Sequence, residues 1–185
     1  MRHEFAPAHL DLRAFAHSSG RLVGSDAVAR YERIAHECQG RGLGRHVQWS
    51  ARGETRADPL GQECIWLHLD VDTTVPLTCQ RCLSVVEVRL LVDRWFRFVV
   101  DEETAAAQDD DVPEDLLVLA GDFDLHQLIE DELVLELPLI ARHETCPTQP
   151  AFTAQDAGFG APSADRPNPF AVLGRLRSTK RGQAK

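Results

Sequence analysis

The sequence has no apolar run of about 18 residues, the length that a membrane-spanning helix needs. Its first segment, MRHEFAPAHLDLRAFAHSSGR, places charges and histidines where a secretory signal peptide has an apolar stretch. We therefore expect a cytoplasmic protein with no membrane contact. Five cysteines, an odd number, favour reduced thiols or a metal site over a disulfide framework.

The sequence also lacks the short motifs of common catalytic sites. It contains no G-x-S-x-G, no glycine-rich phosphate loop and no H-E-x-x-H. His68 and His126 are isolated histidines, for which a structural role is the expectation. No catalytic constellation other than the cysteine pair discussed below therefore stands out, and no small-molecule substrate is expected.

Lys and Arg are absent from residues 101–136, which hold 14 acidic side chains. The last twenty residues, from Arg166, have the opposite character, with six Lys or Arg and no acid. The net charge of −9 therefore combines an acidic middle with a basic tail. This balance alone does not predict a nucleic-acid binder, although the tail can contact phosphates.

Two segments have apolar residues at helical spacing. The first is 24–38, where Ser25 or Asp26 can cap a helix, and the second is 124–138, where Asp124 can do so. Between them, alternating and β-branched stretches predict strands at 45–54, 62–77 and 84–100, with a short one at 116–121. The predicted fold class is α+β, an antiparallel β-meander with flanking helices and a C-terminal amphipathic tail segment.

The composition divides the chain into three parts. Residues 1–146 are predicted to form a single α+β domain, which includes an acidic loop at 101–115. Residues 147–167 are rich in Pro, Gly, Ala and Ser and are expected to be a flexible linker. Residues 168–185 form an amphipathic, basic tail.

Large aromatic side chains occur within the predicted strands. Trp66 lies in one strand, and Trp95, Phe96 and Phe98 lie in the next. Packing in the core is the expected role, and base stacking on an open sheet face is the alternative. Cys38 and Cys64 lie in apolar surroundings and are also expected to be buried.

The segment LTCQRCL places Cys79 and Cys82 at C-x-x-C spacing, between two predicted strands. A redox pair of this kind is normally followed by a helix that lowers the thiol pKa, whereas Cys82 is followed by the strand-like LSVVEV. A second pair, His143 and Cys146, has H-x-x-C spacing just beyond the second helix. Together the four residues are a normal donor set for one structural zinc ion. The alternative is that the cysteines are small buried hydrophobes and His143 is a surface residue.

The tail segment NPFAVLGRLRSTKRGQAK is too short to form a stable helix alone, so its apolar residues are expected to dock on this domain or on a partner. The residues predicted to contact nucleic acid or a partner are Phe170, Leu173, Arg175, Arg177, Lys180 and Arg181.

Three stretches, LTCQRCL, LIEDELVLELPLIARHETC and NPFAVLGRLR, occur in the order and spacing of the YceD family and resemble it. Members of this family are named large ribosomal RNA subunit accumulation proteins. The resemblance runs from about residue 20 to about residue 177 and implies a bacterial cytoplasmic protein without catalytic activity. It also implies that Cys79 and Cys82, and His143 and Cys146, correspond to the family's paired Cys/His positions.

The leading hypothesis, implied by the resemblance, is a non-enzymatic ribosome biogenesis factor. Such a factor supports the synthesis, processing or stability of 23S ribosomal RNA, and its partner is ribosomal RNA or a precursor of the large subunit. The first alternative is an interaction module whose acidic loop binds a ribosomal or assembly protein. The second is a thiol oxidoreductase that uses Cys79 and Cys82.

Overall fold

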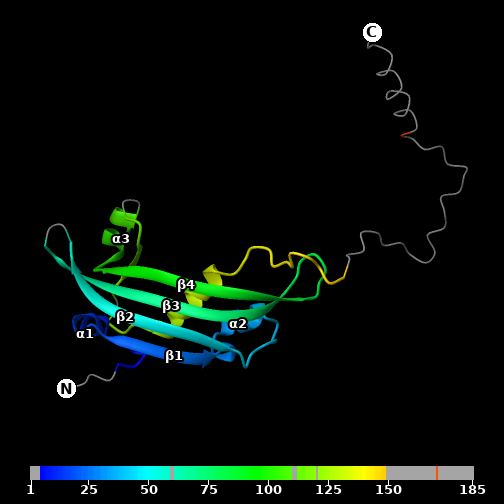
Figure 1. The fold of residues 1–185 in the computed structure, drawn as a ribbon. Coiled ribbons are helices and arrows are strands. Elements are labelled where there is room, and N and C mark those ends of the chain that lie inside the picture. The colour runs from blue at the N-terminus through cyan, green and yellow to red at the C-terminus, as the bar shows by residue number, and fades with distance from the viewer. Residues whose placement is uncertain (1–4, 59–60, 110–111, 120, 149–169, 171–185) are drawn as a thin grey trace, which may run out of the picture. The chain divides into compact units, whose positions relative to one another are not determined.

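The computed structural model of the protein describes residues 5–58, 61–109, 112–119, 121–148 and 170. The chain divides into two compact units, Met1–Gln149 and Pro150–Lys185. All the helices and strands described below belong to the first unit (Figure 1). Except for residues 147, 148 and 170, the predicted linker and tail lie outside the described residues.

A five-stranded sheet in the order β1-β2-β3-β4-β5 is the centre of the first unit (Figure 1). The first four strands form the predicted antiparallel meander, and the α+β class is confirmed. The fifth strand differs, because it pairs with β4 in parallel and returns through a connection that contains a helix. The strands are β1 Arg21–Ala27, β2 His46–Ala57, β3 Glu63–Thr78, β4 Val85–Val99 and β5 Asp115–Val118.

Side chains alternate between the two faces of the sheet, and one face is buried. On β3, the predicted inward residues Ile65, Leu67, Leu69 and Val71 are all at most 5% exposed. Phe96 and Phe98 of β4 also lie in this core, as predicted. We call this side of the sheet the inner face, and the side that carries Trp66 and Trp95 the outer face.

Helices α1 (Leu12–His17), α2 (Glu32–Glu37) and α4 (Leu125–Leu135) contribute apolar side chains to the same core as the inner face. Helix α1 lies against β2 at Gly53, where an added Cβ would lie 2.6 Å from the Phe15 ring and 3.0 Å from the Ala16 backbone. A glycine at this position therefore allows the helix to pack directly on the strand.

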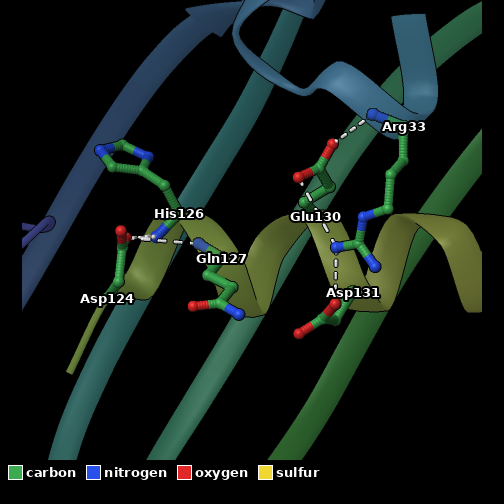
Figure 2. Close-up of polar contacts among 6 residues, drawn as sticks. All are labelled: Arg33, Asp124, His126, Gln127, Glu130 and Asp131. Carbon is green, nitrogen blue, oxygen red and sulfur yellow. Dashed lines mark hydrogen bonds and ion pairs between the residues drawn. The ribbon is translucent and has the colours of Figure 1, made fainter. Parts of the chain in front are cut away.

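Helix α4 begins as predicted, because the Asp124 carboxylate accepts hydrogen bonds from the backbone N–H groups of His126 and Gln127 (Figure 2). Its position is fixed from two sides. Arg33 of α2 reaches Glu130 and Asp131, as Figure 2 shows. On the sheet side, Arg94 pairs with Glu132 of α4 and with Glu136, the residue that caps the C-terminal end of α4.

Two segments differ from the sequence prediction. The predicted helix 24–38 is wrong in its first part, because residues up to Ala27 belong to β1. Asp26 does not cap a helix there; it accepts hydrogen bonds from Tyr31 Oη and Trp49 Nε1. Within the predicted acidic loop, Glu102–Gln108 form helix α3, which Asp101 caps through the Thr104 N–H. None of the helices in the described residues is long and apolar enough to span a membrane.

We expect Gly53→Ala to lower the free energy of unfolding by roughly 1–3 kcal/mol, because the new methyl group would force α1 away from β2. Gly44→Ala is the matched control, since no atom lies within 4 Å of an added Cβ there, and it should change stability by less than about 0.5 kcal/mol. Urea unfolding of both variants measures the difference. Equal stabilities would show that α1 does not need this close approach.

Candidate metal centre

The tip of the β3–β4 hairpin presents the first two residues of the centre. Cys79 N–H donates to the Ser84 carbonyl at 2.9 Å, and Leu83 N–H donates to the Cys79 carbonyl at 2.8 Å. These bonds close a tight turn in which Leu83 has a positive φ of 61°. A leucine in the left-handed region costs on the order of 1 kcal/mol, so the turn is held in a conformation that Leu83 does not favour by itself.

The segment after α4 lies beside this tip. The N–H of Gln80 donates to the Ala141 carbonyl at 2.8 Å, which joins the two backbones. Arg81 adds three bonds, to the carbonyls of His143 and Glu144 and, through Nε, to Cys146 Sγ at 2.9 Å. Arg81 therefore orients both members of the H-x-x-C pair.

The structure brings the four predicted residues together. The potential ligand atoms of Cys79, Cys82, His143 and Cys146 all lie within 4.8 Å of one another. Cys79 is buried, and the other three are half-buried. Among the residues that the structure describes, no other group of His, Cys, Asp or Glu has this arrangement.

The distances fit a tetrahedral ion. Zinc–sulfur bonds of about 2.3 Å and zinc–nitrogen bonds of about 2.0–2.1 Å give tetrahedron edges of about 3.8 Å between sulfurs and about 3.6 Å between sulfur and nitrogen. Cys79 Sγ lies 3.9 Å from Cys146 Sγ, and Cys82 Sγ lies 3.5 Å from His143 Nδ1. The four residues can therefore hold a metal ion without a large rearrangement of these two pairs.

The second nitrogen of His143 also has a defined partner. His143 Nε2 lies 2.9 Å from the Val85 carbonyl, which can only accept, so the proton is on Nε2 and Nδ1 is free to act as a ligand. A hydrogen bond of this kind fixes the tautomer and orientation of metal-binding histidines. The sequence did not reveal the contributions of Arg81 and the Val85 carbonyl, because neither residue type is a metal ligand.

The thiols do not share one environment. Burial raises the pKa of Cys79, but backbone hydrogen bonds from His143, Cys82 and Arg81 lower it by more, to about 5. The Ser84 hydroxyl, 2.9 Å from Cys82 Sγ, lowers the pKa of Cys82. Burial raises the pKa of Cys146, and hydrogen bonding with Cys79 raises the pKa of His143. Cys79 is thus held as a thiolate, the form that binds metals.

The other predicted residues lie outside this centre. Cys38 is buried as predicted, whereas Cys64 is only half-buried. Phe170 is 70% exposed within the second unit. The remaining predicted tail contacts, Leu173, Arg175, Arg177, Lys180 and Arg181, lie outside the described residues.

Fold and site together define an α+β protein with a Cys₃His centre that joins a hairpin tip to the segment after α4. Comparison with known proteins places the chain in a family. Residues 67–177 match the model of the family described as "Large ribosomal RNA subunit accumulation protein YceD". The chain belongs to the YceD family.

A curated relative supports this placement. The large ribosomal RNA subunit accumulation protein YceD of Haemophilus influenzae is 34% identical over 125 residues, which cover 63% of this chain and 67% of the relative. No solved structure matches the chain.

In metal-free protein, the low pKa of Cys79 should make its contribution to stability depend on pH. A thiol with a depressed pKa in the folded state stabilises the fold above its unfolded pKa of about 8.5, and this contribution is lost as the pH falls towards about 5. The difference in unfolding free energy between the parent and Cys79→Ser, measured in chelator, should therefore narrow from about pH 9 to about pH 5.

Cys38→Ser is the control for this measurement. Burial raises the pKa of Cys38, so the thiol stays protonated in both states at lower pH. The difference between the parent and Cys38→Ser should be constant from about pH 5 to about pH 8. A Cys79→Ser difference that is equally constant would show that Cys79 is not a thiolate in the folded protein.

Proposed function

We propose that this protein is a non-enzymatic ribosome biogenesis factor that supports the accumulation of the large-subunit ribosomal RNA, 23S. The observation that carries the proposal is membership of the YceD family, whose matched residues include the whole Cys₃His centre. The proposal includes a location in the cytoplasm and association with ribosomal RNA or a precursor of the large subunit. No catalytic step is part of it.

The proposed role of the Cys₃His centre is to hold one structural zinc ion. Four protein ligands complete a tetrahedral shell and leave no open position for a substrate or an activated water. Cys79 and Cys82 come from the hairpin tip, and His143 and Cys146 come from the segment after α4. Because metal affinity is coupled to folding, the ion would stabilise the junction between these two parts of the chain.

Two further contacts are proposed from the sequence. The tail residues Phe170 and Leu173 would anchor on RNA or a partner, and the neighbouring basic residues Arg175, Arg177, Lys180 and Arg181 would contact phosphates. The alternative, in which the acidic segment binds a basic ribosomal or assembly protein, has one structural feature in its favour. Glu102 and Glu103 are exposed in the first turn of α3.

Reduced protein that has never been exposed to chelator should contain about one zinc ion per chain, measured by elemental analysis. Cys79→Ser and His143→Ala should each lose most of the zinc and lower the temperature of unfolding, because each removes a ligand. Cys38→Ser should keep the zinc, since Cys38 is buried away from the centre. Parent protein without zinc, or equal zinc in all three variants, would contradict the proposed centre.

Depletion of the protein in its own host should lower the ratio of large-subunit to small-subunit ribosomal RNA, and the parent gene should restore it. A gene in which Arg175, Arg177, Lys180 and Arg181 are changed to Gln should restore the ratio less well, because four phosphate contacts are lost. A gene in which Glu102 and Glu103 are changed to Gln tests the acidic segment. An unchanged ratio after depletion would refute the proposed function.

A further inference from the structure

The outer face of the sheet carries polar and aromatic side chains that the proposed function does not yet use. Helices α1, α2 and α4 pack on the inner face, so they leave the outer face of β1–β4 to other contacts. One row of paired residues crosses all four strands on this side, because residues opposite each other point to the same face. This row consists of Arg21, Arg52, His68 and Trp95.

Arginine and tryptophan side chains stack alternately beside this row. The guanidinium of Arg56 lies 4.0 Å from the centre of the Trp95 ring and 4.3 Å from that of the Trp66 ring. Arg52 lies 5.3 Å from the Trp95 ring, and the His68 ring lies 4.6 Å from it. We call Arg52, Arg56, Trp66 and Trp95 the stacked cluster. Flat cationic and aromatic groups held in this way are the surfaces on which unpaired bases stack.

An open cavity of about 530 Å³ adjoins the stacked cluster. This volume lies within the range of small-molecule pockets, roughly 300–1,000 Å³, and admits one nucleobase with its ribose. Its walls include Trp66 and Trp95 together with the carboxylates of Asp93, Glu114 and Asp115. Carboxylate oxygens accept hydrogen bonds from the amino groups on base edges.

One buried polar atom of a residue that lines this cavity has no hydrogen-bond partner in the part of the chain that the structure describes. Trp66 Nε1 is buried and has no hydrogen-bond acceptor among the described residues. A buried donor without an acceptor costs free energy, and a small turn of the Trp66 ring towards the cavity would let a ring nitrogen or carbonyl oxygen of a bound base accept from it. The sheet core does not explain this orientation, since Trp66 lies on the outer face.

Among the described residues, two arginines at the end of the row have no anionic partner. Arg21 and Arg52 are directly opposite each other on β1 and β2, and both are exposed. Like charges in this position repel, and no ion pair of either side chain occurs within the part of the chain that the structure describes. Other outer-face arginines are paired, Arg56 with Glu54, Arg89 with Asp72 and Arg97 with Glu114. An external anion would therefore be attracted to Arg21 and Arg52 in particular.

We propose that the outer face binds single-stranded RNA, with one unpaired base on the stacked cluster and a neighbouring phosphate on Arg21 and Arg52. This inference rests on the proposed function and names the surface and the form of RNA. Duplex RNA does not fit the arrangement, because its bases are already stacked inside the helix and cannot enter the cavity.

The test uses the full chain with its metal retained and a fluorescent, unstructured RNA of about 12 nucleotides and mixed sequence. Anisotropy titrations over a series of salt concentrations give the affinity and its salt dependence. Arg21→Gln with Arg52→Gln should weaken binding roughly 25-fold at about 0.1 M salt and reduce the slope of log K against log salt by about 1.4, the effect of two phosphate contacts. The control pair, Arg13→Gln with Arg30→Gln, removes the same charge from exposed positions outside this row and should change both quantities much less.

The stacking contact is tested separately. Trp95→Ala should weaken binding about 5- to 150-fold, the range for the loss of one stacked base, with an unchanged salt slope. Trp95→Phe keeps an aromatic ring and should recover most of the affinity. The same RNA annealed to its complement should bind much more weakly than the single strand.

The inference is overturned if the single strand binds no better than the duplex, or if the Arg21/Arg52 pair behaves like the Arg13/Arg30 control. It is also overturned if the parent does not bind the RNA, even where the gene restores the large-subunit ratio in depleted cells. That last result would leave the proposed function intact and remove only this RNA surface. An unchanged ratio after depletion would refute the proposed function independently of the binding data.

Discussion

The antiparallel pairing of β3 with β4 is the interaction on which the rest of the structure depends. It runs from Ile65 opposite Phe98 to Thr78 opposite Val85, almost the full length of both strands. Its inner side supplies the core on which the helices pack, its outer side carries Trp66 and Trp95, and its tip carries Cys79 and Cys82. A slip of one residue in this register would exchange the two faces and move the tip relative to His143.

The parts of the fold that could be predicted are those in which one physical signal dominates. The alternation around Leu67 and Leu69 fixes an inner face, and Asp124 is a capping residue at the start of an apolar helix. The helix predicted at 24–38 is partly wrong. Its apolar residues fit helical spacing, but residues up to Ala27 pair with β2 and form a strand. Pairing between distant segments is not a local property of the sequence, so spacing alone could not reveal it.

The candidate metal centre could also be predicted only in part. Spacing identified four residues of suitable chemistry, since two-residue gaps let both members of a pair face one ion. It could not reveal that Arg81 positions Cys146 or that the Val85 carbonyl sets the tautomer of His143. On the outer face, packing in the core was the expected role of the large aromatics, and it holds for Phe96 and Phe98. Trp66 and Trp95 lie on the opposite side, because side chains alternate along each strand and their neighbours Leu67 and Phe96 take the inward positions.

The sequence separation within the Cys₃His centre has a consequence for the order of events during synthesis. Cys82 and His143 are 61 residues apart, and the chain between them contains β4, α3, β5 and α4. An ion bound to both residues would close a loop between them. By analogy with a disulfide, the lower conformational entropy of the closed loop in the unfolded chain would stabilise the folded protein by about 4 kcal/mol. That restraint cannot act on a nascent chain that ends before His143. The hairpin can therefore form while the chain is still growing, and its tip is secured only when the last ligands have left the ribosome.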